Sequence, residues 1–370
     1  MKTITGIAAS AAIMALAAFA LATSVSSANA QTPGTAGSSE LVAAANREGR
    51  LVVYSVTSSV PALLEDFQKL YPGIKLDYVA LDTTPLYDRV VSESKAGVTA
   101  DVLWSSAMDL QVKLVNDGYA ARYESPEARA IPAWANWRNE AFGTTFEPVG
   151  FVYNKTLLKP SEVPQTRAGL LDMLAKDPSR LKGRITAFDP GKSGVGYLMM
   201  TQDSDAMAAG AFWDVAGALG SMQVFPGTGS GAQFERLSRG DSLFGYDLLT
   251  SYATGRIKKD LPNLGIVWPL DHTLVVTRVM FISAKAAHPN AAKLWVDYLL
   301  SKRGQEQLAR ADLGALRADV TDEMTPGALG RKLGGAVKPI AVGPDLLRHL
   351  DGARHDEFVR HWNAAMAGSH

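Results

Sequence analysis

The chain has 370 residues, 37 Lys plus Arg against 37 Asp plus Glu, and no cysteine. The missing cysteines exclude a disulfide framework and a lipid-modified cysteine anchor. The balanced charge lacks the basic excess of a nucleic-acid-binding protein, and the length suits two lobes rather than one ordinary domain.

Residues 1–30 have the pattern of a secretory signal. Met1-Lys2 gives a positive start, residues 7–25 are uncharged and rich in Ala and Leu, and Ala28-Asn29-Ala30 is a small-x-small cleavage motif. The apolar stretch is nearly long enough for a membrane anchor, but the cleavage motif favours removal. We therefore expect an exported, periplasmic protein that begins at Gln31, with a flexible leader over 31–40.

Helix and strand patterns alternate along most of the remaining chain. Short apolar, β-branched runs predict buried strands, and Pro61 fits the first turn of a helix. The first predicted elements are a helix at 40–48, a strand at 51–54, a helix at 61–70, a strand at 74–79 and a helix at 86–97. This order predicts an α/β fold with helices covering a mainly parallel sheet.

Two places indicate crossings between lobes. One is the strand Gly150–Asn154, and the other is Trp268-Pro269 with the apolar run that follows it. The sequence therefore predicts lobe 1 over 41–149 and 275–370, and lobe 2 over 150–274. The tail over about 344–366 is predicted to be helical, because Phe358 and Trp362 are spaced to share one helix face.

Four apolar strands run into short Ser/Thr/Gly loops that open helices, two in each lobe. Such loops lie together at the carboxyl ends of parallel strands, and their hydroxyls, free N–H groups and positive helix ends suit phosphate or carboxylate. Ser and Thr are also ordinary helix caps, so one such loop alone does not indicate a binding site. The prediction depends on the pattern occurring four times. The candidate binding residues are Thr57, Ser58, Ser105, Ser106, Ser193, Gly194, Thr228 and Ser230.

Three further residues are candidates with an equally good structural interpretation. Tyr246 and Asp247 end a predicted strand and offer a phenol and a carboxylate to a ligand's hydroxyl or amine groups, or else form a structural cap. Asn154 ends the crossing strand and either reaches into a cleft or caps the turn at Thr156.

The sequence carries no common catalytic, metal or cofactor motif. It lacks a Gly-x-Ser-x-Gly elbow, a His-Glu-x-x-His pair and a dinucleotide fingerprint, and the Gly191-Lys192-Ser193 run does not complete a phosphate loop. None of the six histidines falls in the candidate loops, and His272 is the one nearest a predicted crossing. We therefore expect no catalytic residue, metal site or cofactor.

These features together resemble the ferric-iron-type branch of extracellular solute-binding proteins, which are periplasmic receptors of ABC importers. The resemblance implies two α/β lobes of the type II periplasmic-binding-protein architecture, a ligand cleft between them, a membrane permease as partner, a monomer and no enzymatic activity. The segments that carry it are Leu51–Ser55, Ala100–Val102, Gly118-Tyr119, Gly150–Asn154, Asp189-Pro190 with Ser193-Gly194, and His288–Leu294 followed by Gly304-Gln305.

The resemblance also bears on the ligand. Iron-binding members of the family carry a Tyr-Tyr pair after a Gly-Glu step, whereas here Gly240-Asp241 is followed by Thr250-Ser251 and a lone Tyr252. Relatives that bind phosphorylated sugars, phosphoglycerate or phosphonates have loops more like these. The main hypothesis is a receptor for a small phosphorylated or carboxylated organic anion.

Two alternatives remain open. The first is a ferric-iron or iron-chelate receptor that uses Tyr246, Tyr252 and Asp247. The second is a periplasmic transferase or hydrolase, which the absence of a base near the Ser-rich loops disfavours.

Overall fold

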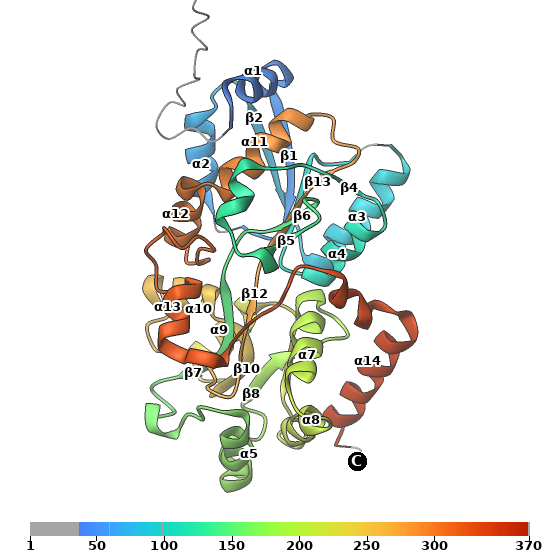
Figure 1. Cartoon of the computed structure of the whole chain (residues 1–370). Coiled ribbons are helices and arrows are strands. Elements are labelled where there is room, and N and C mark those ends of the chain that lie inside the picture. Colours follow the sequence, from blue (N-terminus) through green and yellow to red (C-terminus); the bar gives the residue numbers. More distant parts are fainter. Residues whose placement is uncertain (1–36, 59, 98, 369–370) are drawn as a thin grey trace, which may run out of the picture. The chain divides into compact units, whose positions relative to one another are not determined.

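Two mixed β-sheets organise the part of the chain that the structure describes, residues 37–58, 60–97 and 99–368 of a computed structural model (Figure 1). All of these residues fall in one compact unit, Gln31–His370. The predicted signal over 1–30 and most of the predicted leader lie outside the described residues. Helix α1 begins within the predicted leader, at Ser39, and the hydroxyl of Ser38 caps it by accepting from the Leu41 N–H at 3.2 Å.

The first sheet has the strand order β2-β1-β3-β13-β6-β5, with β4 beside β13. Strands β1, β2 and β3 are parallel, whereas β13 runs antiparallel to β3, β4 and β6. The strands are β1 (Arg50–Ser55), β2 (Lys75–Ala80), β3 (Val102–Ser105), β4 (Ala120–Ala121), β5 (Asn136–Trp137), β6 (Ala141–Gly143) and β13 (Val279–Ser283).

The helices of the first sheet bury an aromatic cluster. Phe67 of α2 packs edge-on against Trp295 and Tyr298 of α11, with ring centroids 4.9 and 5.3 Å apart. Because such rings bury large apolar areas, this contact fixes α2 against α11. The helices are α1 (Ser39–Glu48), α2 (Pro61–Leu70), α3 (Thr83–Lys95), α4 (Met108–Asn116), α11 (Pro289–Leu300) and α12 (Lys302–Arg310).

The second sheet has the order β14-β12-β7-β10-β8-β9, with β11 beside β7. Its strands are β7 (Glu147–Asn154), β8 (Ile185–Phe188), β9 (Phe225–Gly227), β10 (Phe244–Leu249), β11 (Leu264–Val267), β12 (Thr273–Val276) and β14 (Val337–Pro339). Its helices are α5 (Arg167–Lys176), α6 (Pro178–Leu181), α7 (Gly194–Ala206), α8 (Ala211–Ser221), α9 (Ser230–Arg239), α10 (Thr250–Lys259) and α13 (Pro326–Leu333). Short 3₁₀ turns are η1 (Pro126–Ala130), η2 (Ala133–Ala135), η3 (Pro160–Glu162), η4 (Gly334–Ala336) and η5 (Pro344–Leu350).

The α/β class and the two-lobed architecture are confirmed, but the mainly parallel sheet is wrong. Strand β7 is antiparallel to β10, β11 and β12, and β13 is antiparallel to its neighbours in the other sheet. Strands β7, β12 and β13 lie next to the points where the chain passes from one sheet to the other. A chain that crosses and returns reverses direction, so each sheet combines a parallel βα part with antiparallel returning strands.

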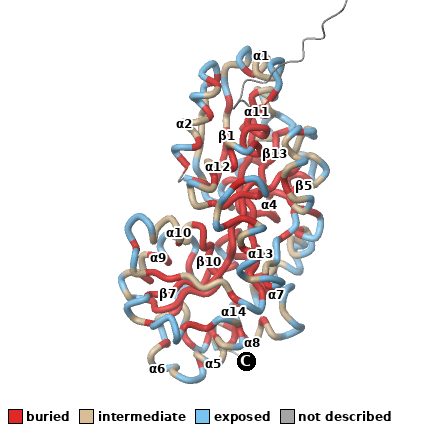
Figure 2. The backbone as a smooth tube through the Cα atoms, turned by 60° about the vertical axis from the view of Figure 1, so that its left-hand side comes forward, coloured by how far each residue is buried: buried red, intermediate tan, exposed pale blue. Residues whose placement is uncertain are grey.

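The chain passes between the sheets at two short linkers. Residues 144–146 join β6 to β7, and Thr277-Arg278 joins β12 to β13. Strands β7 and β13, which follow these linkers, are buried and are drawn in red in Figure 2. The expected lobe boundaries, 150 and 275, lie a few residues from these linkers.

No helix within 37–58, 60–97 and 99–368 is long and apolar enough to cross a membrane.

The C-terminal segment differs from its expected assignment to the first lobe. Strand β14 pairs with β12 in the second sheet, and helix α14 (Gly352–Met366) packs along α8 (Figure 1). As the spacing predicted, Phe358 and Trp362 share a buried face, and both stack on Phe212 of α8. In the chain between β14 and α14, the 3₁₀ turn η5 packs on α4 of the first sheet.

Helix α14 approaches α8 closely at Gly220. A Cβ placed there would lie 1.9 Å from the Ala365 carbonyl oxygen, so the main chain of α14 would have to move. We expect Gly220→Ala to lower the free energy of unfolding by about 1–3 kcal/mol and to speed limited proteolysis of the tail. Gly330→Ala is the control, because the space beside Gly330 in α13 is open and alanine favours the helix. Equal stability of both variants would contradict this packing.

Asp109 of α4 gives the fold a pH dependence. Its side chain is buried beside η5, and loss of hydration raises the pKa of Asp109 to about 7. The folded state then holds a proton that the unfolded state releases near pH 4, so wild-type stability falls as pH rises from about 4 to about 7. Asp109→Asn removes this contribution. Urea denaturation at several pH values measures both proteins. As pH rises from about 4 to about 7, the free energy of unfolding of the variant should increase relative to that of wild type by up to about 1.4 kcal/mol per pH unit. Parallel pH profiles would contradict this.

Candidate functional site

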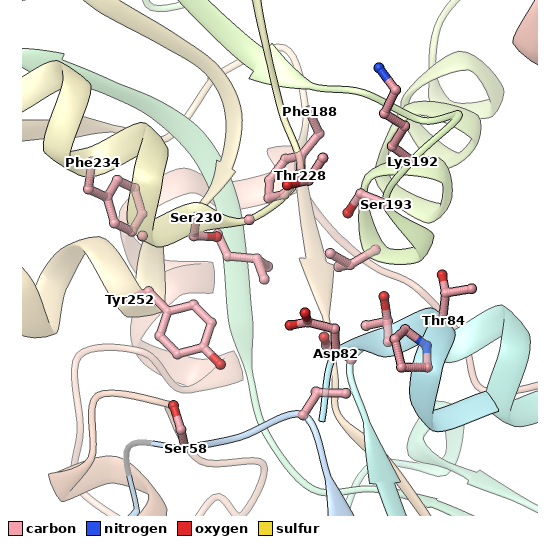
Figure 3. Close-up of a pocket in the computed structure, with 18 of the residues that line it drawn as sticks. Ser58, Asp82, Thr84, Phe188, Lys192, Ser193, Thr228, Ser230, Phe234 and Tyr252 are labelled. Atoms are coloured by element: carbon pink, nitrogen blue, oxygen red, sulfur yellow. The ribbon is translucent and has the colours of Figure 1, made fainter. Parts of the chain in front are cut away.

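A cavity of about 670 Å³ lies where the strand-to-helix connections of the two sheets meet (Figure 3). Strands β1, β2 and β3 are parallel in the first sheet, as are β8, β9 and β10 in the second. The connections after β1, β2, β3, β8 and β9, and the end of β10 where α10 begins, contribute to the cavity wall. The site is therefore built at the carboxyl ends of parallel strands, where open α/β sheets bind ligands.

Five of the predicted binding residues line this cavity. Each of the four Ser/Thr/Gly loops that the sequence singled out contributes at least one of them, so loops far apart in the chain face the same space. The residues are Ser58, Ser106, Ser193, Thr228 and Ser230.

Helix N-termini contribute main-chain polar groups to the wall. Helices α3, α7, α9 and α10 all begin there. Ser193 caps α7 by accepting from the Gly196 N–H at 3.2 Å, whereas the N-cap residues Asp82, Gly229 and Leu249 make no side-chain cap bond. Free N–H groups and the positive dipole ends of α7, α9 and α10 favour an anion, whereas α3 begins at the Asp82 carboxylate.

An apolar and aromatic surface completes the wall. Phe188 and Phe234 lie on the second-sheet side, and the Tyr252 ring, with its phenol, stands nearby (Figure 3). Small-molecule sites combine such apolar lining with a few placed polar groups. The cavity therefore suits a ligand with both an apolar body and a charged end.

Two predicted residues, Thr57 and Ser105, are buried behind the wall, and a third, Gly194, stands between the wall residues Ser193 and Val195. The Thr57 hydroxyl is buried and accepts from the Arg278 guanidinium at 2.7 Å. Ser105 is buried and accepts from the Ala107 N–H at 3.2 Å. Gly194 begins α7, and a Cβ there would lie 3.2 Å from the Thr83 hydroxyl. Thr57 and Ser105 shape the loops, because their hydroxyls are occupied by contacts within the protein, whereas Gly194 contributes its main-chain N–H to the start of α7.

Asn154 takes its structural alternative. Its side-chain oxygen accepts from the N–H of Thr156 at 2.9 Å and from its hydroxyl at 2.6 Å, while its amide donates to the Leu237 carbonyl at 2.7 Å. Because these bonds to the turn after β7 and to α9 occupy the side chain, the prediction that Asn154 faces a cleft is corrected.

Tyr246 and Asp247 are also placed away from the cavity. Both are fully buried, the Tyr246 hydroxyl donates to Asp203, and Arg167 pairs with Asp247 at 2.9 Å. His272 joins this cluster through Asp203, at 2.6 Å. Burial raises the pKa of Asp247 to about 8. The prediction that these residues read a ligand is corrected, because protein groups surround them.

The connection between β2 and α3 also belongs to the cavity wall, although it is not among the predicted loops. Asp82, Thr83 and Thr84 line the cavity there, followed by Pro85. The signal was present, since an Asp-Thr-Thr-Pro run follows a predicted strand and opens a helix, as in the other loops. Tyr252 and Arg256 on α10 also line the cavity without being among the predicted anion-binding residues, although Tyr252 was a candidate ligand for iron.

A buried ion pair at the linkers supports both sides of the cavity. Arg278 contacts Glu147 at 2.9 Å, and both side chains are fully buried. Arg278 also donates to Thr57, next to Ser58 on the wall, and Glu147 accepts from Ser251 at 2.7 Å, next to Tyr252. The pair therefore joins loops from both sheets.

We expect Thr57→Val to lower the free energy of unfolding by about 1–3 kcal/mol, because a buried guanidinium N–H loses its acceptor. Thr57→Ser, which keeps the hydroxyl, is the matched control and should retain most of the stability. Urea denaturation measures both variants. A loss no larger for Val than for Ser would show that the hydroxyl bond to Arg278 contributes nothing.

The wall offers few groups that suit a hard metal ion. Among the described residues, no group of three or more His, Cys, Asp or Glu side chains is placed to hold a metal. Tyr252 and Asp82 are the phenol and the carboxylate on the cavity wall. Ferric iron favours several such oxygen ligands or imidazoles, so the chemistry of this wall fits an organic anion better.

Comparison with known proteins gives consistent matches. A sequence model of the bacterial extracellular solute-binding proteins matches residues 55–306. The substrate-binding protein of an ABC transporter from Agrobacterium tumefaciens is 38% identical, with a TM-score of 0.81 over 86% of this chain and 94% of that one. An uncharacterised protein of Haemophilus influenzae is 27% identical over 297 residues, 77% of this chain and 82% of its own.

More distant structures share the fold. The periplasmic binding protein AfuA from Actinobacillus pleuropneumoniae, with exogenous fructose-6-phosphate bound, has a TM-score of 0.70 at 20% identity, covering 86% of this chain and 98% of its own. A ferric binding protein from Campylobacter jejuni has a TM-score of 0.68 at 17% identity, covering 85% and 99%. At these identities the likeness concerns the fold.

Proposed function

The chain belongs to the bacterial extracellular solute-binding proteins, and from this premise we propose that it is a periplasmic receptor of an ABC importer for a small organic anion. The family consists of receptors, and a binding role needs no catalytic group. The ligand is phosphorylated or carboxylated, and it occupies the cavity between the two sets of loops.

The convergence of helix N-termini is the observation that carries this proposal. Three helices of the second sheet, α7, α9 and α10, begin at one cavity, and the N-cap residues of α9 and α10 leave the first N–H groups without a side-chain cap bond. A phosphate or carboxylate satisfies such groups and gains from the dipoles. Hydroxyls from Ser58, Ser106 and Thr228 add neutral donors around the same space.

The architecture supports a transport role through ligand-dependent closure. A ligand that contacts loops from both sheets stabilises the arrangement in which both sets of contacts are made. The permease subunits then recognise that arrangement. Export fits the predicted signal over residues 1–30.

Ferric iron is the weaker alternative for the same fold. Its expected ligands Tyr246 and Asp247 are fully buried in the cluster with Arg167, which leaves Tyr252 on the cavity wall. A titration with ferric citrate separates the two proposals, because an iron–tyrosinate complex gives a visible absorption band that an organic anion does not.

The test is a thermal-shift screen of sugar phosphates, phosphoglycerates, phosphonates and dicarboxylates. A ligand at about 100 times its dissociation constant should stabilise the protein by about 2.7 kcal/mol. Ser106→Ala and Thr228→Ala should each weaken binding about tenfold, since each removes a hydrogen bond to a charged group. Ser221→Ala, on the surface of α8, is the control and should bind as wild type. A hit whose affinity neither pocket variant changes would place the ligand elsewhere.

A further inference from the structure

The charged side chains on the cavity wall differ in whether they form ion pairs within the protein. The wall carries two cations, Lys192 and Arg256, and one acid, Asp82. Lys192 pairs with Asp189 at 3.0 Å, and Arg256 pairs with Asp260 at 2.7 Å and with Glu235 at 2.5 Å. Both cations are therefore neutralised by acids of the protein itself.

Asp82 has no such partner. No hydrogen bond or ion pair to its carboxylate is found in the described part of the chain, although Asp82 is the N-cap residue of α3, where a carboxylate commonly accepts from the helix. In Figure 3 the Asp82 carboxylate points into the cavity, whereas the Lys192 ammonium points away from it. Among the charged side chains on the wall, the one without an ion-pair partner in the described residues is therefore the negatively charged Asp82.

This acid stands opposite the anion-binding groups. Ser193, Thr228 and the beginnings of α7 and α9 belong to the second sheet, whereas Asp82 follows β2 of the first. An anionic end held by the helix N-termini leaves the rest of the ligand facing a carboxylate. A carboxylate accepts hydrogen bonds but cannot donate them at neutral pH, and it repels a second anion.

We propose that Asp82 is a specificity-determining residue that selects ligands carrying an anion at one end and a hydrogen-bond donor, an ammonium or a hydroxyl, at the other. Ligands with an anion at both ends are rejected. This inference rests on the proposed function, because it requires an anion in the same cavity. It makes the receptor one for amino- or hydroxyl-bearing phosphate or carboxylate compounds, not for dicarboxylates or phosphorylated carboxylates.

Three phosphate monoesters of similar size test this inference. Glycerol 3-phosphate and 3-phosphoglycerate differ in a terminal hydroxymethyl against a carboxylate, and phosphoethanolamine carries an ammonium. Calorimetry with the full-length mature protein should show 3-phosphoglycerate binding at least about tenfold more weakly than glycerol 3-phosphate, a difference of about 1.4 kcal/mol. The ratio between glycerol 3-phosphate and phosphoethanolamine tells which donor the site prefers.

Asp82→Asn is the decisive variant, because it keeps the shape and removes the charge. It should tighten 3-phosphoglycerate, weaken phosphoethanolamine and bring the tenfold ratio below about threefold. Glu65→Gln, on the exposed face of α2, makes the same change in net charge away from the cavity and should leave all three affinities at wild-type values.

The outcomes separate this inference from the proposed function. If wild type binds the esters without discriminating against 3-phosphoglycerate, or if Asp82→Asn leaves the ratio unchanged, Asp82 does not select the ligand and the anion receptor stands. If Glu65→Gln changes the ratio as much as Asp82→Asn, net charge and not the local carboxylate is responsible, and the inference fails.

If none of the three esters binds to wild type at millimolar concentration while the wider screen gives hits, the inference alone fails. If the wider screen gives none either, both fail.

Discussion

The buried ion pair between Arg278 and Glu147 is the contact on which the geometry of the cavity depends. Both side chains are fully buried at the linkers between the sheets. Removing either partner would leave an uncompensated charge in the interior, which costs several kcal/mol. The pair therefore fixes the two linkers against each other, and through Thr57 and Ser251 it holds the loops on which Ser58 and Tyr252 stand.

A wall made mostly of neutral groups can still bind the anionic ligand that we propose, because helix ends supply partial charges. Parallel strands end at the cavity in both sheets, and their helices begin there with free N–H groups. Partial charges from helix ends need no desolvated cations of their own. The cations that do reach the wall are already paired, so the electrostatic character of the site comes from main-chain groups on one side and from Asp82 on the other.

The sequence predicted the features that local patterns decide. Ser58, Ser106, Ser193, Thr228 and Ser230 could be found because an apolar strand followed by a Ser/Thr/Gly loop is visible within a few residues. Tyr246 and Asp247 could not be placed, because their burial is decided by Arg167 and Asp203, which are distant in sequence. The antiparallel strands were missed for a similar reason, since their direction follows from where the chain crosses between sheets. Asp82 was within reach of the same local pattern and was overlooked.

The C-terminal segment adds a third passage of the described chain between the sheets. After α12 on the first sheet, the chain continues through α13 to β14 in the second sheet, and the Val342 N–H then bonds the Trp134 carbonyl at 2.8 Å before α14 returns to α8. Two linkers alone would permit the halves to twist about the line that joins them. A third attachment opposes such torsion, so we expect bending about the linkers to be the softer motion in the closure that we propose.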